Sequence, residues 1–600
     1  MCGITAYCGQ QEALSFLMQG LSKLEYRGYD SAGITTLENN QLLTIKCKGR
    51  LKNLEEKIKN YQVHGSIGIG HTRWATHGIP SNLNSHPHNN SHDTISLVHN
   101  GIIENYRQLK KELIENGYKF QSDTDSEVIV QLLDYYYDGE LLEATQKVLK
   151  RIEGSYALCI ISTLEPDKII VAKKDSPLII GKATNAYVVA SDIPALLEYT
   201  KDVYFLDDLE VAMIKKDHIS FYNQQGKRIE KTLTTVPYDL EAAKKDGYDT
   251  FMLKEIHEQP YVINETLRGR IFNEQIILDE LKDINFQQFN KVYFVACGTA
   301  YHASLCGSQV LQRVTQLPVI SMVASEFRYN DPLIDQHTLA IFVSQSGETA
   351  DTLAALKLAK QKQATTIAIA NVLGSTISRD SDYVLYTCAG PEIAVASTKA
   401  YTTQLVLLIL LAYYIAQRLN KEVDFQLIHQ LNSIPQYVEK ILKDEKIFEK
   451  YAYMLKDLHD AYFIGRNLDY ASVLEGALKL KEVSYVHADA YVAGELKHGP
   501  IALIEEGSVV IAVATQPHIA AKTISNIQET IARGAHVILF TTHNENIKHV
   551  ENIYYLPQIA PTLQAILVAI PLQLIAYYTA CIKGCDVDKP RNLAKSVTVE

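Results

Sequence analysis

The sequence lacks several features on which secreted, nucleic-acid-binding and metal-binding proteins depend. Its nine cysteines are scattered, odd in number and without a CxxC pair, which argues against a disulfide framework and a zinc site. The net charge of -11 leaves no basic excess for binding a phosphate backbone, so nucleic acid is not an expected partner. The N-terminus has no basic stretch followed by an apolar run, so we predict no secretory signal.

Long hydrophobic runs are also missing. The most apolar stretch, LVLLILLAYYIA, covers 12 residues, 405–416, whereas a membrane span needs roughly 20. A second apolar region, 563–582, is broken by Gln564, Pro571 and Gln573. We therefore predict two buried helices, no membrane association and a cytoplasmic protein.

The chain instead has the composition of a large globular protein, with 47% hydrophobic and 21% charged residues. Its 600 residues suggest about three or four domains. The polar stretch 234–250 separates two regions of different character, and we place a boundary near 240. The first region is predicted to be a strand-rich α+β domain, with strands in 65–76, 94–101, 154–162 and 186–192 and helices near 11–24 and 125–150.

The second region carries an internal repeat. Apolar strands alternate with helical segments, which indicates parallel sheets covered by helices. The predicted strands form two sets, 291–298, 338–346, 366–371 and 383–387, then 461–467, 508–515, 536–542 and 552–557. Matching strands lie about 170 residues apart, so the region is most simply a duplicated α/β unit.

The chain begins MCGITAYCGQ, which places a cysteine directly after the start methionine. If Met1 is removed, Cys2 carries both a thiol and an α-amine whose ordinary pKa is roughly 8. The amine could then take the proton of the thiol, so one residue would supply nucleophile and base. The alternative is a small buried cysteine in a first strand.

A predicted anion site follows strand 338–346 in the first copy of the repeat. The segment SQSGETADT leads into an amphipathic helix, and backbone N–H groups converge at such a helix start. The alternative is an ordinary capped helix. The equivalent segment of the second copy, 513–519, has lost the glycine and most hydroxyls. No nucleotide P-loop or GxGxxG turn is present, so a sugar phosphate is the favoured ligand.

Candidate acid–base residues lie in the second copy and the tail. Glu475, Lys479 and Glu482 share one helix face, which is also typical of a salt-bridged surface. His498 lies in the loop GELKHGP, and Lys595 in a polar C-terminal tail could form a Schiff base. A group of histidines at 71, 77, 86, 88, 92 and 99 lacks a recognisable metal-ligand pattern, so no metal is expected.

Taken together, these motifs closely resemble the glutamine–fructose-6-phosphate aminotransferase (isomerizing), or glucosamine-6-phosphate synthase, family over essentially the whole chain. The motifs that carry the resemblance are MCGI, LEYRGYDSAG (24–33), HTRWATHG (71–78), HPH (86–88), HNGIIEN (99–105), SDTDSEV (122–128), ACGTAY (296–301), SEFRY (325–329), SQSGETADT (344–352), VASTKA (395–400), EGALKLKE (475–482), GELKHGP (494–500) and PRNLAKSVTVE (590–600).

The resemblance implies an N-terminal Ntn-hydrolase αββα glutaminase domain at 1–240. It makes Cys2 the nucleophile, Asn100 and Gly101 the oxyanion hole, and Trp74 the gate of an ammonia channel. The residues implied to bind glutamine are Arg73 for the carboxylate, Asp125 for the amine, the pocket residues Thr76, His77 and His86, and Arg27 in a closing loop. An arginine and an aspartate suit a zwitterionic amino acid.

The resemblance also implies two α/β SIS (sugar isomerase) units with parallel sheets, 241–425 and 426–590, and a tail, 591–600, over the sugar site. His498 would open the sugar ring, Lys595 form the Schiff base and Glu482 move a proton. The residues implied to bind the sugar phosphate are Thr299, Ser344, Gln345, Ser346, Thr349, Val395, Ser397 and Lys479. Ala300 stands where the family often has serine, which puts one sugar contact in doubt.

The expected activity is therefore synthesis of glucosamine 6-phosphate from L-glutamine and D-fructose 6-phosphate, without metal, flavin or nucleotide and in a homodimer. One alternative is a sugar-phosphate sensor with a vestigial glutaminase, although a sensor would not need Lys595, Glu482 and His498 together. Another Ntn amidotransferase is disfavoured because the chain has no SGGxDS pyrophosphatase loop.

Overall fold

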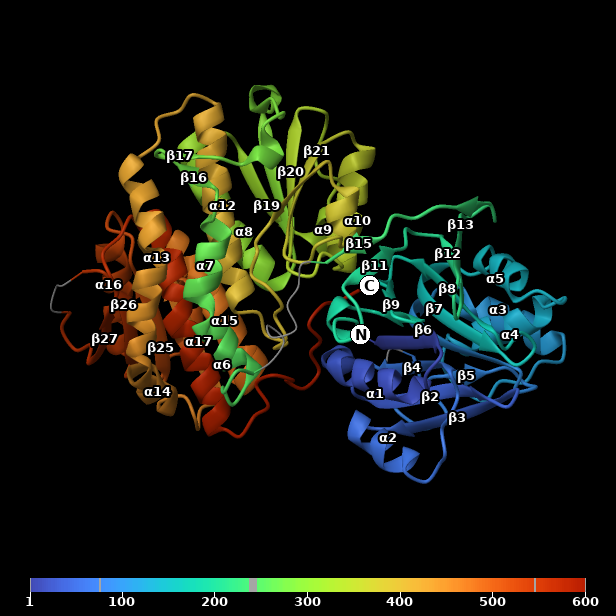
Figure 1. Ribbon diagram of the computed structural model, residues 1–600. Coiled ribbons are helices and arrows are strands. Elements are labelled where there is room, and N and C mark those ends of the chain that lie inside the picture. Colours follow the sequence, from blue (N-terminus) through green and yellow to red (C-terminus); the bar gives the residue numbers. More distant parts are fainter. Residues whose placement is uncertain (1, 75–76, 237–244, 544–546, 599–600) are drawn as a thin grey trace. The chain divides into compact units, whose positions relative to one another are not determined.

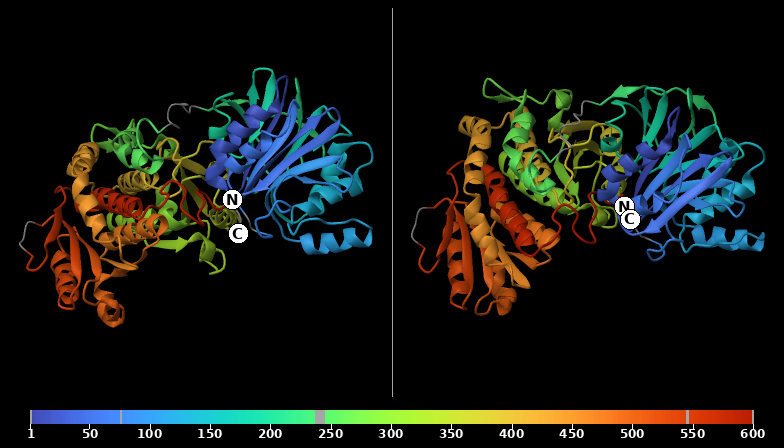
Figure 2. Two further views of the ribbon diagram at one scale, coloured as in Figure 1. Left: turned by 90° about the horizontal axis from the view of Figure 1, so that it is seen from below. Right: turned by 60° about the horizontal axis from the view of Figure 1, so that its bottom comes forward.

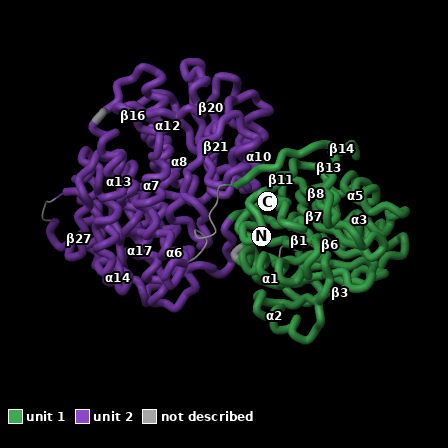
Figure 3. Tube along the Cα trace, in the orientation of Figure 1, with its two compact units in different colours: residues 1–244, 596–600 green, residues 245–595 purple. Residues whose placement is uncertain are grey.

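A computed structural model describes residues 2–74, 77–236, 245–543 and 547–598. The chain divides into two compact units, shown in Figure 3. Unit 1 comprises residues 1–244 and 596–600, and unit 2 comprises residues 245–595. The predicted boundary near 240 lies outside the described residues.

Unit 1 contains two antiparallel sheets. The strands of the first sheet, in spatial order, are β15 (Thr234–Thr235), β11 (Asp202–Phe205), β9 (Ile179–Ala183), β10 (Ala186–Ala190), β1 (Gly3–Gly9), β4 (Ile67–Arg73), β2 (Ser31–Glu38) and β3 (Gln41–Lys48). Those of the second are β14 (Arg228–Ile229), β13 (Ile219–Tyr222), β12 (Val211–Lys215), β8 (Lys168–Lys174), β7 (Gly154–Ser162), β6 (Ile95–Ile103) and β5 (His88–Asn89).

Helices cover the outer faces of these sheets, as Figures 1 and 2 show. They are α1 (Ala13–Leu24), α2 (Leu51–Ile58), α3 (Tyr106–Glu115), α4 (Glu127–Tyr136) and α5 (Leu141–Leu149). Strands β1 and β7 meet in one core, where Ile4 and Ala6 pack with Cys159 and Ile161. The opposite face of β7 packs against α4 and α5. Unit 1 is therefore a four-layer αββα arrangement, as the family resemblance implies.

Unit 2 contains two parallel five-stranded sheets with the same topology. The first has the order β19 (Val319–Val323), β18 (Lys291–Ala296), β20 (Thr338–Ser344), β21 (Thr365–Ala370) and β22 (Tyr383–Tyr386). The second has the order β24 (His487–Val492), β23 (Asp460–Gly465), β25 (Val509–Ala514), β26 (His536–Thr541) and β27 (Asn552–Tyr555). This matched order confirms the duplication inferred from the spacing.

Helices enclose both faces of each sheet. They are α6 (Phe251–His257), α7 (Gln259–Leu267), α8 (Gly298–Thr315), α9 (Ala324–Phe327), α10 (Ala350–Gln361), α11 (Thr376–Asp380), α12 (Lys399–Arg418), α13 (Phe425–Lys443), α14 (Glu445–Tyr453), α15 (Leu468–Ser484), α16 (Ala520–Ile531) and α17 (Gln564–Ile582). Alternate residues of β18 point to opposite faces, because Phe294 packs with α8 and α12 while Tyr293 packs with α9 and α10. Burial on both faces explains the continuous apolar runs of the strands.

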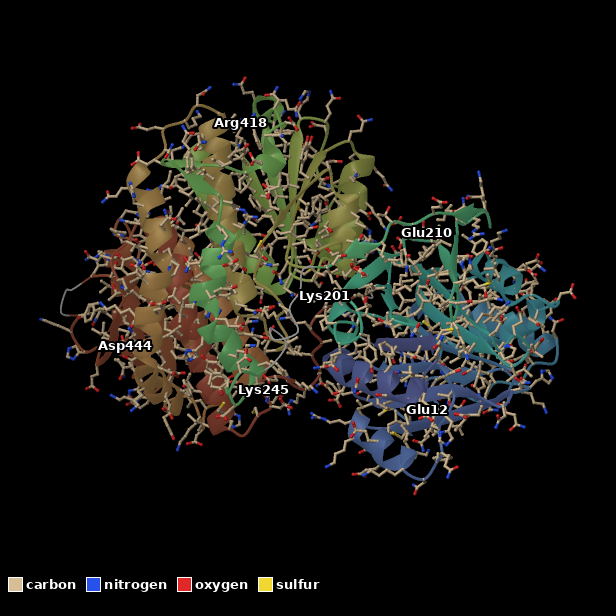
Figure 4. The ribbon with its side chains drawn as sticks, viewed as in Figure 1. Glu12, Lys201, Glu210, Lys245, Arg418 and Asp444 are labelled. Carbon is tan, nitrogen blue, oxygen red and sulfur yellow. The ribbon has the colours of Figure 1, made fainter. Side chains whose placement is uncertain are left out.

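The two most apolar helices differ from what the sequence analysis expected in length or in continuity. Segments Lys399–Arg418 and Pro561–Ile582 have 20 and 22 residues, long and apolar enough to cross a membrane by length and composition alone. The prediction that the run 405–416 is too short is therefore wrong, because α12 continues beyond it at both ends. The second region is not broken, because Pro571 and Gln573 lie inside α17. The prediction that both helices are buried is confirmed, since 94% and 83% of their most apolar windows are buried. Figure 4 marks the end of α12 at Arg418 and the end of α13 at Asp444.

The packing of α8 against α12 gives a first prediction. A Cβ atom at Gly307 would lie 2.9 Å from Leu408 Cβ, which is closer than packed carbon atoms allow. Gly307→Ala should therefore destabilise unit 2 by about 1–3 kcal/mol, despite the better helix propensity of alanine. Calorimetry of the full chain measures the effect, and Gln312→Ala, at an exposed site on the same helix, serves as the control. A higher melting temperature for Gly307→Ala would contradict this packing argument.

Candidate functional sites

Cys2 lies at the start of β1 and is held by backbone groups of Trp74. The N–H of Trp74 donates to the Cys2 sulfur at 3.3 Å, and the thiol faces the Trp74 carbonyl at 3.5 Å. The carbonyl of Cys2 accepts from Asn100 Nδ2 at 3.0 Å and from Arg27 Nε at 3.3 Å. Arg27 also pairs with Asp192 at 3.1 Å. The predicted nucleophile, Asn100 and Arg27 are thus brought together.

The orientation of the Asn100 amide is fixed from both ends. Its oxygen accepts from His71 Nε2 at 3.0 Å, and its nitrogen donates to Ser191 Oγ at 3.0 Å as well as to Cys2. The next residue, Gly101, has φ of +130°, and a Cβ there would lie 2.1 Å from the Ser155 carbonyl. Only glycine fits this position. The backbone of β6 can therefore place its two predicted residues, Asn100 and Gly101, beside Cys2.

Four histidines form a buried cluster behind this site. The rings of His71 and His86 stack at 4.2 Å, and His88 lies edge-on to His86 at 4.5 Å. His99 contacts Ser126 Oγ at 2.8 Å. Burial lowers the pKa of all four, that of His71 to about 3, so these imidazoles are neutral at ordinary pH. Within the described residues, no group of three or more His, Cys, Asp or Glu side chains is arranged to hold a metal ion.

Arg73 and Asp125 lie beside the cluster. The Nη2 atom of Arg73 donates to the carbonyls of His77 and Gly78, whereas its buried Nη1 has no hydrogen-bond partner among the described residues. Asp125 accepts from the Ile103 N–H at 2.8 Å and lies 4.0 Å from His77 Nδ1. The site therefore has an unused cationic donor and a nearby carboxylate. The predicted pocket residue Thr76 lies outside the described residues.

The predicted phosphate cradle lies at the carboxyl end of β20. Ser344 Oγ accepts from the Gly347 N–H and contacts Thr349 Oγ1, both at 3.0 Å. The Glu348 N–H donates to Ser346 Oγ at 3.2 Å. Gly347 has φ of +68°, and a Cβ there would lie 2.2 Å from Ser375 Oγ. The turn thus brings the predicted hydroxyls together before α10.

The second copy fills the equivalent position with its own carboxylate. Thr515 lies 170 residues after Gln345, and its N–H and hydroxyl donate to Asp469 at 2.8 and 2.5 Å. Asp469 belongs to the first turn of α15 and is buried, which raises its pKa to about 6. An internal anion is therefore bound where the first copy has its cradle.

Lys479 lies at the centre of a buried polar group between α8 and α15. Its ammonium contacts Glu482 at 2.5 Å, Thr299 Oγ1 at 3.0 Å and Glu475 at 3.5 Å. Burial alone would lower the pKa of Lys479, but Glu482 and Glu475 outweigh burial and raise it. Glu475 also pairs with His302 at 2.8 Å. The lysine therefore stays charged and holds Glu482 in place.

Lys595 is drawn into unit 2 from the C-terminal tail. Its ammonium pairs with Glu392 and donates to the Ala394 carbonyl at 2.9 Å and to Ser397 Oγ at 3.2 Å. Both charged side chains are almost completely buried. Predicted Val395 lies in the same segment, where its N–H donates to the Asp588 carbonyl at 3.0 Å. Glu392, the direct partner of Lys595, was missed by the sequence analysis.

The predicted residue His498 and the position of Ala300, where the family often has serine, lie in different settings. His498 is exposed at the end of the short helix η6 (Ala493–His498), and in the described part of the chain no hydrogen bond or ion pair joins it to Glu482 or Lys595. Ala300 lies buried in the first turn of α8, so it offers no hydroxyl beside Thr299.

Comparisons with known proteins agree with both halves of the chain. The SIS domain family matches residues 285–414 and 454–583, and a glutamine amidotransferase domain family matches 71–198. A glutamine–fructose-6-phosphate aminotransferase (isomerizing) of Clostridium tetani is 54% identical, and one of Caldanaerobacter subterraneus is 52% identical, each over 100% of both chains. A solved C-terminal domain of a glucosamine-fructose-6-phosphate aminotransferase from Francisella tularensis is 38% identical, with a TM-score of 0.56 over 58% of this chain and 100% of that one.

The neutral histidines predict that acid weakens unit 1. In the unfolded chain these imidazoles bind protons below about pH 6.5, but in the folded chain their pKa values are lower. Stability should therefore fall as pH decreases from about 6.5, by up to roughly 1.4 kcal/mol per pH unit for each histidine. Trp74, the single tryptophan, reports thermal unfolding of unit 1 by fluorescence. His88→Gln should make the dependence shallower, and a melting temperature that stays constant down to about pH 4 would refute the argument.

Proposed function

The chain belongs to the glutamine–fructose-6-phosphate aminotransferase (isomerizing) family, and we propose that it makes glucosamine 6-phosphate and glutamate from fructose 6-phosphate and glutamine. The observation that carries the proposal is that Cys2 and Lys595 each lie among side chains suited to a different half-reaction, in a chain matched end to end by such enzymes.

We propose that unit 1 hydrolyses glutamine. Arg73 Nη1, which has no hydrogen-bond partner among the described residues, suits the α-carboxylate, and Asp125 suits the α-ammonium. The sulfur of Cys2 then attacks the amide carbon, ammonia leaves, and water hydrolyses the thioester to glutamate. Asn100 and Gly101 would stabilise the oxyanion. One N–H of the Asn100 amide would then leave the Cys2 carbonyl and donate to the substrate oxygen instead.

Unit 2 would bind and aminate the sugar. The cradle at Ser344, Gln345, Ser346 and Thr349 takes the phosphate, where N–H groups and hydroxyls meet a helix start. The Lys595 amine forms an imine with the C2 carbonyl, and ammonia then replaces the lysine. Glu482, held by Lys479, moves a proton from C1 to C2.

Ammonia has to reach the sugar before it equilibrates with water, because at pH 7 it would mostly be protonated and no longer nucleophilic. We propose that Trp74, beside the thiol, gates its release. We also propose a cytoplasmic protein, four segments with borders near 240, 425 and 590 as predicted, and chemistry that requires no cofactor.

Isotope transfer tests the proposed function. With amide-¹⁵N glutamine and fructose 6-phosphate, the product should be ¹⁵N-labelled glucosamine 6-phosphate even when unlabelled ammonium is present in excess. Cys2→Ala should abolish glutamate formation but leave sugar isomerisation, whereas Cys8→Ala, buried on the same strand, should leave both. Binding of the sugar phosphate without any product would instead favour the sensor, and loss of the label to the ammonium pool would rule out protected transfer.

The exposed His498 predicts that two chains share a sugar site. We propose a homodimer in which His498 of one chain opens the sugar ring bound by the other chain. His498→Asn and Lys595→Ala variants should each lack synthase activity, and mixed dimers of the two should regain roughly a quarter of it, since one site in each heterodimer is then complete. Lys583→Ala, an exposed change near the tail, is the control. No recovery in verified heterodimers would contradict sharing.

A further inference from the structure

A buried carboxyl group that the proposed chemistry does not use lies next to the Lys595 site. Glu255, on α6, is only 2% exposed. One of its oxygens, Oε1, accepts the N–H groups of Ile393 and Ala394 at 2.5 and 3.1 Å. These two residues follow Glu392, which pairs with Lys595, and the Ala394 carbonyl also binds Lys595. Glu255 therefore anchors the backbone that carries two of the partners of Lys595.

The second oxygen of Glu255 is not used in this way. Oε2 is buried and has no hydrogen-bond partner among the described residues. Ionisation of a carboxyl group in such a position is unfavourable, because no hydrogen bond offsets the desolvation of that oxygen. The anchoring bonds need only a neutral carbonyl oxygen, so the geometry is compatible with a protonated acid.

Counting charges around the site supports the same conclusion. Three lysines face three other acids. Lys254 lies 2.6 Å from Asp246 and 3.4 Å from Glu258, Lys399 lies 2.7 Å from Glu258, and Lys595 pairs with Glu392. Glu255 is a fourth acid without a lysine of its own in these pairs. Its ionisation would add a second negative charge beside the buried Glu392, which Lys595 already neutralises.

The groups that surround Glu255 come from several segments. Burial and repulsion from Glu392 raise the pKa of Glu255 to about 8, while Lys595 from the tail and Lys399 from α12 act in the opposite direction. The helices α7 and α17, which pack against α6, contribute Gln259 and Gln573, whose uncharged amides bond to each other at 2.9 Å.

We propose that Glu255 is a positioning residue for Lys595. Glu255, an uncharged acid at neutral pH, holds the segment 392–394 in place. This inference rests on the proposed function. Lys595 has to lose a proton before its nitrogen can attack a carbonyl. A second carboxylate near Lys595 would stabilise its ammonium, so an uncharged Glu255 keeps that proton easier to release. Ionisation of Glu255 in alkali should therefore slow the reaction.

Two substitutions separate anchoring from charge. Glu255→Gln keeps an oxygen that can accept both N–H groups but cannot ionise, whereas Glu255→Leu removes the acceptor. The assay is isomerisation of fructose 6-phosphate without glutamine, from about pH 6 to about pH 10. Glu265→Gln, an acid of α7 paired with Arg268, is the control.

Glu255→Gln should keep kcat within about threefold at neutral pH, and its alkaline decline should move to higher pH than in the unsubstituted enzyme. Glu255→Leu should lower kcat by roughly 10- to 100-fold with little change in KM, because misplacing a reacting group affects the reaction more than binding. An unchanged alkaline limb in Glu255→Gln would overturn the role of charge. Full activity of a folded Glu255→Leu variant would overturn anchoring.

A stability measurement tests the protonation state of Glu255 without an activity assay. A carboxyl group whose pKa is higher in the folded than in the unfolded chain costs stability as pH rises between those two values. The melting temperature of Glu255→Gln, relative to the unsubstituted chain, should therefore increase from about pH 5 to about pH 8 and then level off. A constant difference would overturn the proposal. If the unsubstituted chain shows no turnover, the proposed function fails, yet this measurement still decides the charge state of Glu255.

Discussion

The buried ion pair between Lys595 and Glu392 is the interaction on which the proposed sugar site depends. Removing two charges from water is costly, and their attraction repays the cost only when further hydrogen bonds satisfy both groups. Glu392 accepts the N–H groups of Thr398 and Ala400 at 2.9 and 3.0 Å, while Lys595 binds Ala394 and Ser397. The loop before α12 and the first turn of that helix thus supply these partners. This explains how Lys595, from a polar segment of the chain, is held within unit 2.

Unit 2 has two similar sheets that arose by duplication, but the turn after β20 and the turn after β25 make different contacts. In the first copy, Ser344 and Thr349 bond to each other and to the turn at Gly347, where a ligand phosphate can add its own charge. In the second copy, Asp469 already provides a carboxylate to Thr515. A backbone position that favours an anion is therefore satisfied internally in the second copy, whereas in the first copy we propose that it binds the substrate phosphate. The same fold can then place substrate binding in one copy and Glu482 in the other.

The two parallel units could be predicted because buried strands form apolar runs and the repeat spacing is regular. For unit 1 the strand pattern predicted only a strand-rich α+β domain, and the αββα arrangement came from the family resemblance. Strands β19 and β24 were missed because they lie at sheet edges and are partly exposed, so their sequences mix polar and apolar residues. Motifs drew attention to Cys2 and Lys595. They could not reveal Glu392 or Glu255, because a buried carboxylate has no sequence signature that separates it from an exposed one. Only the folded structure shows which acidic side chains are buried away from water.

The surroundings of Cys2 also bear on how its thiol loses a proton. Within the described residues, the sulfur has only the backbone N–H and carbonyl of Trp74 as hydrogen-bond partners. His71, the histidine bonded to Asn100, presents Nε2 to two oxygen acceptors, Asn100 Oδ1 and the His99 carbonyl, and so carries its proton there. Its low pKa makes it a weak base. A side-chain base of the Cys–His type is therefore absent from the described contacts of the thiol. This supports the proposal that, once Met1 is removed, the α-amine of Cys2 takes the proton.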